Sequence, residues 1–173
     1  ENKKIKLQLF TDMVEDKLLM RLVDEQGNPT NNIFDRVRVI PDPSTPKEFP
    51  VNSAIEDLEN GILSFRQILP YEEPDKYNIA KGHPKDKAFR LSATVNSSLI
   101  KTTRINWDGN REQMGRLEGS LTGKASFFAS VSLTEGLNTE VPEELSSDQS
   151  PDNKKFETSL EQSTQIWKNY WNK

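Results

Sequence analysis

The sequence predicts a mostly β protein, an antiparallel sandwich or barrel of short strands followed by an acidic linker and a short C-terminal amphipathic helix. Three observations lead to this prediction. Apolar and polar residues alternate in several short runs, which is the two-residue period of a half-buried strand. Turn-forming residues separate these runs. No amphipathic helix lies between them, whereas βαβ units would require one between successive strands.

The first part of the chain contains three alternating runs. They cover residues 5–10, 18–22 and 37–39. The second run ends at Gly27 and Pro29, because glycine accepts a positive φ and proline cannot donate to a strand ladder. The third ends at a segment over 41–50 that contains four prolines and is therefore expected to be a loop.

The stretch from Asp57 to Ile79 is the most characteristic part of the sequence. An acidic turn containing Gly61 is followed by a strand in which Leu63, Phe65 and Leu69 share one face. A proline corner then leads to a second strand with Tyr77 and Ile79. This order of turn, strand, corner and strand is typical of a small antiparallel sandwich.

The clearest hairpin in the sequence joins residues 89–95 to residues 99–107 across Asn96-Ser97-Ser98. A last strand contains Phe127, Ala129, Val131 and Leu133. Between them, residues 109–123 are expected to form a long connection or a weak hairpin. Residues 1–133 together should therefore fold as one β-sandwich domain.

The remainder of the chain differs in charge and composition. Residues 134–173 hold eight acidic and four basic residues, whereas residues 1–133 hold nineteen of each. Residues 134–155 are rich in Glu, Ser, Asn, Asp and Pro, so they cannot bury enough apolar surface to order themselves alone. We therefore expect an acidic flexible linker or strap over 134–155.

Residues 156–173 are expected to form an amphipathic helix, with Thr158 and Ser159 as candidates for its N-terminal cap. Its apolar residues recur at helical spacing, and they are the candidate partner-binding residues. They are Phe156, Leu160, Ile166, Trp167, Tyr170 and Trp171. Such a helix either lays its apolar face into a groove on another protein or folds back onto its own sheet and covers an open edge.

Composition excludes several kinds of function. The chain has no cysteine, which excludes disulfides, thiolate metal sites and a cysteine nucleophile. A neutral body with an acidic tail argues against nucleic acid as a partner, because phosphate binding requires clustered Lys and Arg. No apolar run reaches the roughly 20 residues needed to span a bilayer, so membrane insertion is not expected.

Val23 to Pro29 and Asp57 to Ile79 together resemble the strand and turn signatures of carboxypeptidase-regulatory-like, collagen-adhesin B-type and bacterial Ig-like sandwich modules. The resemblance covers roughly residues 18–105 and implies an Ig-like or prealbumin-like β-sandwich in a surface, adhesion or scaffold protein. It also implies an extracellular or cell-surface location, with a cytoplasmic one as the alternative. Some such modules form isopeptide bonds, but no motif assigns that role to Lys6, Lys101 or Asn106.

Few residues are candidates for a ligand-binding or catalytic site. Trp107, Asp108 and Asn110 place an aromatic face beside polar groups, which makes them candidates for binding a carbohydrate, although a strand-end tryptophan packed on the core before an ordinary turn is the preferred explanation. His83 lies in a turn-like setting without an orienting partner. No cofactor, metal site or catalytic residue is expected. The sequence therefore predicts a non-catalytic structural or protein-binding module, with a carbohydrate-binding module or an adaptor docking through its aromatic helix as alternatives.

Overall fold

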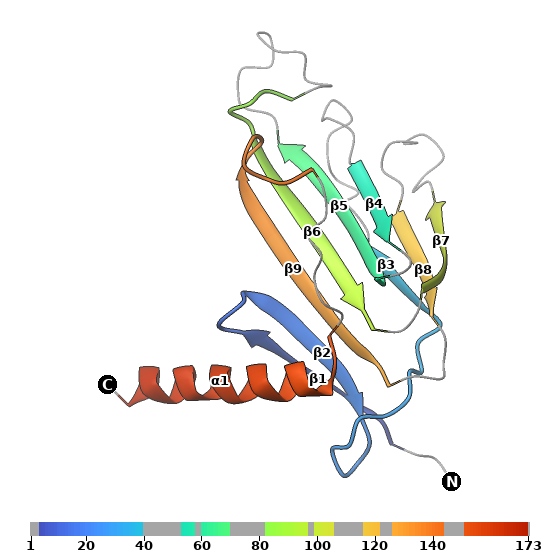
Figure 1. Cartoon of the computed structure of the whole chain (residues 1–173), viewed down its shortest axis with the longest axis vertical. Helices are drawn as coiled ribbons and strands as arrows, with labels where there is room; N and C mark the ends of the chain where they lie inside the picture. Colours follow the sequence, from blue (N-terminus) through green and yellow to red (C-terminus); the bar gives the residue numbers. More distant parts are fainter. Residues whose placement is uncertain are drawn as a thin grey trace.

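A computed structural model places most of the chain (Figure 1). The residues it describes are 4–39, 53–57, 60–69, 82–96, 99–105, 116–121, 126–143 and 151–172. They form antiparallel strands and a single C-terminal helix, which confirms the mostly β prediction.

The described residues form nine strands and one helix. The elements are β1 (Lys6–Asp12), β2 (Lys17–Val23), β3 (Arg36–Val39), β4 (Ser53–Asp57), β5 (Ile62–Leu69), β6 (Lys87–Val95), β7 (Leu99–Ile105), β8 (Arg116–Leu121), β9 (Phe128–Leu137) and α1 (Asn153–Trp171). Six strands form one sheet in the order β1-β2-β9-β6-β5-β4, and three form a second sheet in the order β3-β8-β7. Every strand pair is antiparallel.

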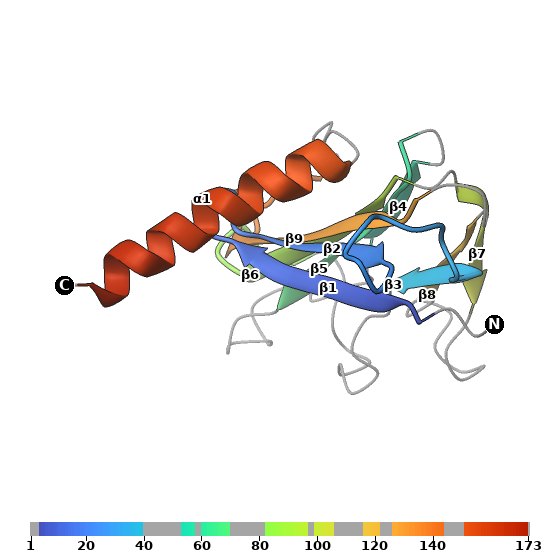
Figure 2. The same ribbon diagram turned by 90° about the horizontal axis from the view of Figure 1, so that it is seen from below.

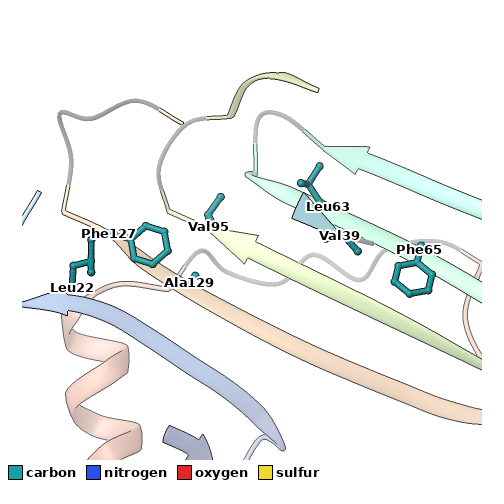
Figure 3. Packing of buried hydrophobic residues seen from close by; sticks show 7 residues of the cluster. All are labelled: Leu22, Val39, Leu63, Phe65, Val95, Phe127 and Ala129. Atoms are coloured by element: carbon teal, nitrogen blue, oxygen red, sulfur yellow. The ribbon is translucent and has the colours of Figure 1, made fainter. Parts of the chain in front are cut away.

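The hydrophobic core lies on one face of the larger sheet, and Val39 of the smaller sheet packs into it. Its buried side chains come from β2, β3, β5, β6 and β9 and from the residue that precedes β9 (Figure 3). They are Leu22, Val39, Leu63, Phe65, Val95, Phe127 and Ala129. The two-residue period of each strand turns these side chains toward the same face of the larger sheet. The three-stranded sheet covers part of that face, with β3 and β8 contacting β5.

The opposite face of the larger sheet is more polar and carries the helix. Ser64, Arg66 and Arg90 are buried on this face, although alternation alone would leave such residues in solvent. A small second cluster of Leu19, Phe128 and Phe156 lies where α1 packs on the sheet. Both faces of the central strands are therefore covered, one by a sheet and the other by the C-terminal part of the chain.

The predicted hairpin between residues 89–95 and 99–107 is wrong. β6 pairs with β5 and β9, whereas β7 pairs with β8 in the other sheet. The connection after β6 therefore passes from one sheet to the other. Asn96 is held on the larger sheet, because its side chain donates to the Ser126 carbonyl at 2.8 Å and accepts from the Phe128 N–H at 2.9 Å. These bonds attach the end of β6 to the start of β9.

The boundaries expected near the C-terminus also change. β9 continues to Leu137, and a turn over 138–143 follows it, so the segment expected as a linker over 134–155 begins inside a strand. The helix begins at Asn153 rather than at residue 156, with Asp152 as its N-cap: the Asp152 side chain accepts from Lys155 N–H at 2.7 Å. Thr158 and Ser159 lie inside the helix and do not cap it. The described turn shows that at least part of this acidic segment is fixed to the domain.

Two strands of the structure differ from the expected ones. β4 was not expected, and β8 lies in the stretch expected to be a long connection or weak hairpin. β4 and β5 join at the predicted acidic turn, where Asn60 N–H donates to the Asp57 carboxylate at 3.1 Å and Gly61 has a φ of 69°. The expected strand with Tyr77 and Ile79 lies outside the described residues.

Candidate functional site

The first half of α1 packs against β1 and β2. Phe156 is 3% exposed and meets Phe10 of β1 edge to face, with ring centroids 5.0 Å apart. Leu160 packs beside it and is partly buried. These two members of the candidate partner-binding set therefore contribute to the protein's own packing. The sequence left open whether the helix folds back or binds a partner, and for this half it folds back.

Arg21 of β2 anchors the first turn of the helix. Its guanidinium carbon lies 4.2 Å from the centroid of the Phe156 ring. The same side chain donates to Asn153 Oδ1 at 2.8 Å and to Glu157 Oε1 at 2.5 Å. Gln8 of β1 accepts a third bond at 2.7 Å. Arg21 is only 5% exposed, and its buried guanidinium is satisfied by three side-chain acceptors, two of them on the helix, which fixes the position of the helix along β2.

The β1–β2 turn holds the middle of the helix. The Met13 N–H donates to the Ser163 hydroxyl at 3.0 Å, and Glu15 forms an ion pair with Lys155. Asp12, which is 1% exposed, accepts hydrogen bonds from the Val14 and Glu15 N–H groups and from Ser159. Burial raises the pKa of Asp12, but these hydrogen bonds lower it more, so the pKa of Asp12 lies below its ordinary value of 3.8.

Beyond Ser163 the helix projects past the edge of the sheet (Figure 2). The remaining four members of the candidate set lie there and are exposed, with Ile166 at 39%, Trp167 at 46%, Tyr170 at 63% and Trp171 at 74%. We call these four residues the aromatic end. Trp167 and Trp171 are stacked with centroids 6.3 Å apart, and the Tyr170 ring stands at 89° to that of Trp171. The aromatic end therefore contacts itself while remaining open to solvent.

Exposed apolar side chains continue from the helix to the β1–β2 turn, where Met13 is 40% and Val14 is 60% exposed. The only residue from 164 to 172 that is charged at neutral pH is Lys168. Isolated exposed apolar residues are ordinary on a protein surface, whereas large contiguous apolar patches are often interaction sites. The sequence identified the helical residues, but it gave no signal that the turn would lie beside them.

Two buried arginines form a cluster that the sequence did not reveal. Arg66 and Arg90 are direct cross-strand neighbours on β5 and β6, and each is 5% exposed. Arg66 donates to the Val141 carbonyl at 3.2 Å and to the Asn138 carbonyl, and Arg90 donates to the Pro142 and Glu143 carbonyls at 2.9 and 2.7 Å. Burial lowers the pKa of Arg90, as does the charge of Arg66, while Glu143 raises it. The pair fixes the turn after β9, which is a structural role.

The other sequence candidates fall into two groups. Trp107, Asp108 and Asn110, proposed for carbohydrate, lie outside the described residues, as does Asn106. His83 accepts a hydrogen bond at Nδ1 from the Lys85 N–H at 3.1 Å, which closes its own turn. Lys6 is exposed and donates to the Glu25 carbonyl. Among the residues that the structure describes, no group of three His, Asp or Glu residues could hold a metal ion.

A scan against models of known protein families finds no match to this chain, and searches of curated proteins and of solved structures find none either. In the described part of the chain, the helix is too polar to cross a bilayer.

Proposed function

We propose that this chain is a non-catalytic β module that binds another protein through the aromatic end of α1, as part of a surface or multi-component assembly. The observation that supports this proposal is the division of a single helix into two halves. The first half is fixed by Phe156 and Arg21, while the four apolar side chains of the aromatic end stay exposed. Tryptophan and tyrosine are the residues that most often dominate protein interfaces.

The division makes the aromatic end suited to docking. An unanchored helix would lose conformational entropy when it bound, whereas this one is already ordered by its first half. A partner with an apolar groove would bury Trp167 and Trp171 without first having to fold the helix. The sheet thus acts as the scaffold, and the free half of the helix acts as the ligand.

For the fold we propose the finer assignment as well, an Ig-like or prealbumin-like sandwich. Its support is the core shared by two antiparallel sheets, with β6 on one sheet followed directly in sequence by β7 on the other. Crossing between sheets is a common feature of such sandwiches.

Crosslinking of the full chain in the cells that naturally make it tests the proposed binding. The double variant Trp167→Ala/Trp171→Ala removes the stacked pair, and Gln165→Ala/Asn169→Ala alters the same half of the helix without removing apolar area. We expect the wild type and the polar control to crosslink to the same protein, and the tryptophan variant to lose about tenfold or more of that product.

Two results would overturn the proposal. The tryptophan variant could retain the partner in full, which would place the interface elsewhere. Alternatively, the wild type could form no protein crosslink and bind another ligand through the same two tryptophans. Binding to phosphatidylcholine vesicles would assign the aromatic end to a membrane surface, and binding to an arrayed glycan would assign it to a sugar. Far-UV circular dichroism of each variant checks that the helix is retained.

A further inference from the structure

The free half of α1 presents the same side of the helix as the half that is packed on the sheet. Ser163 is the last helical residue that the sheet buries, and it lies seven residues after Phe156 and seven before Tyr170. Residues seven apart lie on one side of a helix. Trp167 and Trp171 follow Ser163 in two steps of four residues, which keeps them on that side as well. The aromatic end therefore continues the packed face beyond the sheet (Figure 2).

The exposed face of the aromatic end carries no charge. Lys168 lies five residues after Ser163, which rotates it about 140° away from the packed face. Gln165 and Asn169 also lie on the far side, where their side chains form a hydrogen bond with each other at 2.9 Å. The core of a protein interface is typically depleted of charged residues. Two copies of this face would therefore meet without bringing like charges together.

The β1–β2 turn adds to this apolar surface at a defined position along the helix. The Met13 N–H donates to the Ser163 hydroxyl, so the turn lies beside Ser163, and Met13 and Val14 are 40% and 60% exposed there. Trp167 lies four residues after Ser163, and Trp171 lies four residues after Trp167. The turn and Trp171 are thus equally spaced on either side of Trp167, each about 6 Å away along the helix axis.

This equal spacing makes the surface self-complementary. In a pair of copies related by a two-fold axis near Trp167, the two aromatic ends run antiparallel. Trp171 of each copy then reaches Met13 and Val14 of the other copy, while the two Trp167 rings lie at the axis. Every contact in such an interface occurs twice, because the same surface patch is used by both copies.

The exposed apolar area is large enough to make such a pair. The rings of Trp167, Tyr170 and Trp171 are 46%, 63% and 74% exposed. Since a buried ring covers about 150 to 250 Å², these three rings offer roughly 300 to 450 Å² per copy. A standard interface buries about 800 Å² per partner, so the rings alone supply about half of it. Ile166, the β1–β2 turn and the polar side chains around them are available for the remainder.

We propose that the aromatic end binds a second copy of this chain, forming a symmetric dimer in which the two helix ends lie antiparallel and each covers the β1–β2 turn of the other copy. The inference rests on the proposed function, because it names the protein that the aromatic end binds. The first half of each helix stays on its own sheet, so neither copy has to unfold to form the dimer.

Sedimentation equilibrium of the purified full chain tests the dimer. We expect a reversible equilibrium between monomer and dimer. The variant Trp167→Ala/Trp171→Ala removes the stacked pair and should raise the dissociation constant about tenfold or more. The control Gln165→Ala/Asn169→Ala changes the far side of the same half of the helix and should leave the dissociation constant unchanged.

A second variant tests the turn, which lies outside the helix. Val14→Asn removes an apolar contact at both ends of the interface and should weaken the dimer about tenfold. Its matched control is Leu133→Asn on β9, a side chain that is 57% exposed against 60% for Val14. This control should not affect the dimer. If the tryptophan variant loses its helix by circular dichroism, Val14→Asn decides.

Three results would overturn the inference. The wild-type chain could sediment as a monomer at all concentrations up to about 1 mM, which would show that the copies do not associate. Alternatively, the dimer could keep its dissociation constant in the tryptophan variant, or in Val14→Asn, which would place the contacts elsewhere. Failure here is distinguishable from failure of the proposed function: a monomeric chain whose crosslink to a different protein still requires both tryptophans would leave the proposed function intact.

Discussion

At the scale of single residues, Asp12 links the β1–β2 turn to the helix. Its carboxylate accepts from Val14 N–H at 2.9 Å, from Glu15 N–H at 3.3 Å and from the Ser159 side chain of α1. These bonds favour the ionised form, and they keep the pKa of Asp12 below 3.8 in spite of burial. A carboxyl group whose pKa is lower in the folded state stabilises that state above its unfolded pKa. The contribution is lost as the pH falls through the folded pKa.

Substitution of this carboxylate by an amide should therefore change the response of the protein to acid. We expect Asp12→Asn to be less stable than the wild type at pH 7, because a neutral amide oxygen is a weaker acceptor. The difference should shrink as the pH is lowered from 5 toward 3. Urea unfolding across this range measures it, with the exposed neighbour Asp16→Asn as the control. Parallel curves for the wild type and Asp12→Asn would contradict the role assigned to Asp12.

At the scale of elements, α1 combines a structural half and a free half. Phe156, Ser159 and Ser163 are buried against the sheet, whereas exposure rises steadily from Ile166 to Trp171. The apolar stripe is continuous in sequence, yet the β1–β2 hairpin is shorter than the helix. The free half therefore has nothing of its own sheet to cover, which is why its aromatic residues remain in solvent.

Changes in the two halves of α1 should have unequal effects on the free energy of unfolding. Truncation after Gln165 should change the free energy of unfolding by no more than about 1 kcal/mol, because the residues removed are exposed. Phe156→Ala should cost about 3 to 5 kcal/mol, the usual range for a buried phenylalanine. Urea denaturation at pH 7 compares the two. A truncated chain that loses as much stability as Phe156→Ala would show that the aromatic end is part of the protein's own core.

Elements set by patterns local in sequence were predicted, whereas features set by contacts distant in sequence were not. Alternation predicted β2, β5 and β6, because each presents one face to the core. It did not predict β4, a strand of only five residues next to a proline-rich segment. In the candidate site, the period of 3.6 residues predicted the helix and its apolar stripe. Which part of the stripe docks depends on where the β1–β2 hairpin ends, and no local pattern contains that information.

At the scale of the whole molecule, the step from β6 to β7 determines how the two sheets are connected. Asn96-Ser97-Ser98 is suitable for a hairpin turn, and only contacts distant in sequence decide otherwise. Asn96 makes three of them, because its backbone N–H also donates to the Phe128 carbonyl at 3.0 Å. β6 thus ends on β9 of its own sheet, and the chain that continues from it enters the smaller sheet.

Loss of the Asn96 side chain should weaken this junction. Asn96→Ala removes the bonds to the Ser126 carbonyl and the Phe128 N–H, both partly buried, and should lower the free energy of unfolding by about 1 to 3 kcal/mol. Asn96→Asp keeps the acceptor for the Phe128 N–H but loses the donor to the Ser126 carbonyl. If the Phe128 bond contributes more of the stability, Asn96→Asp should lose less unfolding free energy at pH 7 than Asn96→Ala. Asn169→Ala on the exposed part of α1 is the control. Urea unfolding gives the free energies, and hydrogen exchange at the start of β9 should increase in Asn96→Ala alone. Unchanged exchange there, with full stability, would show that the end of β6 is held on the start of β9 without these side-chain bonds.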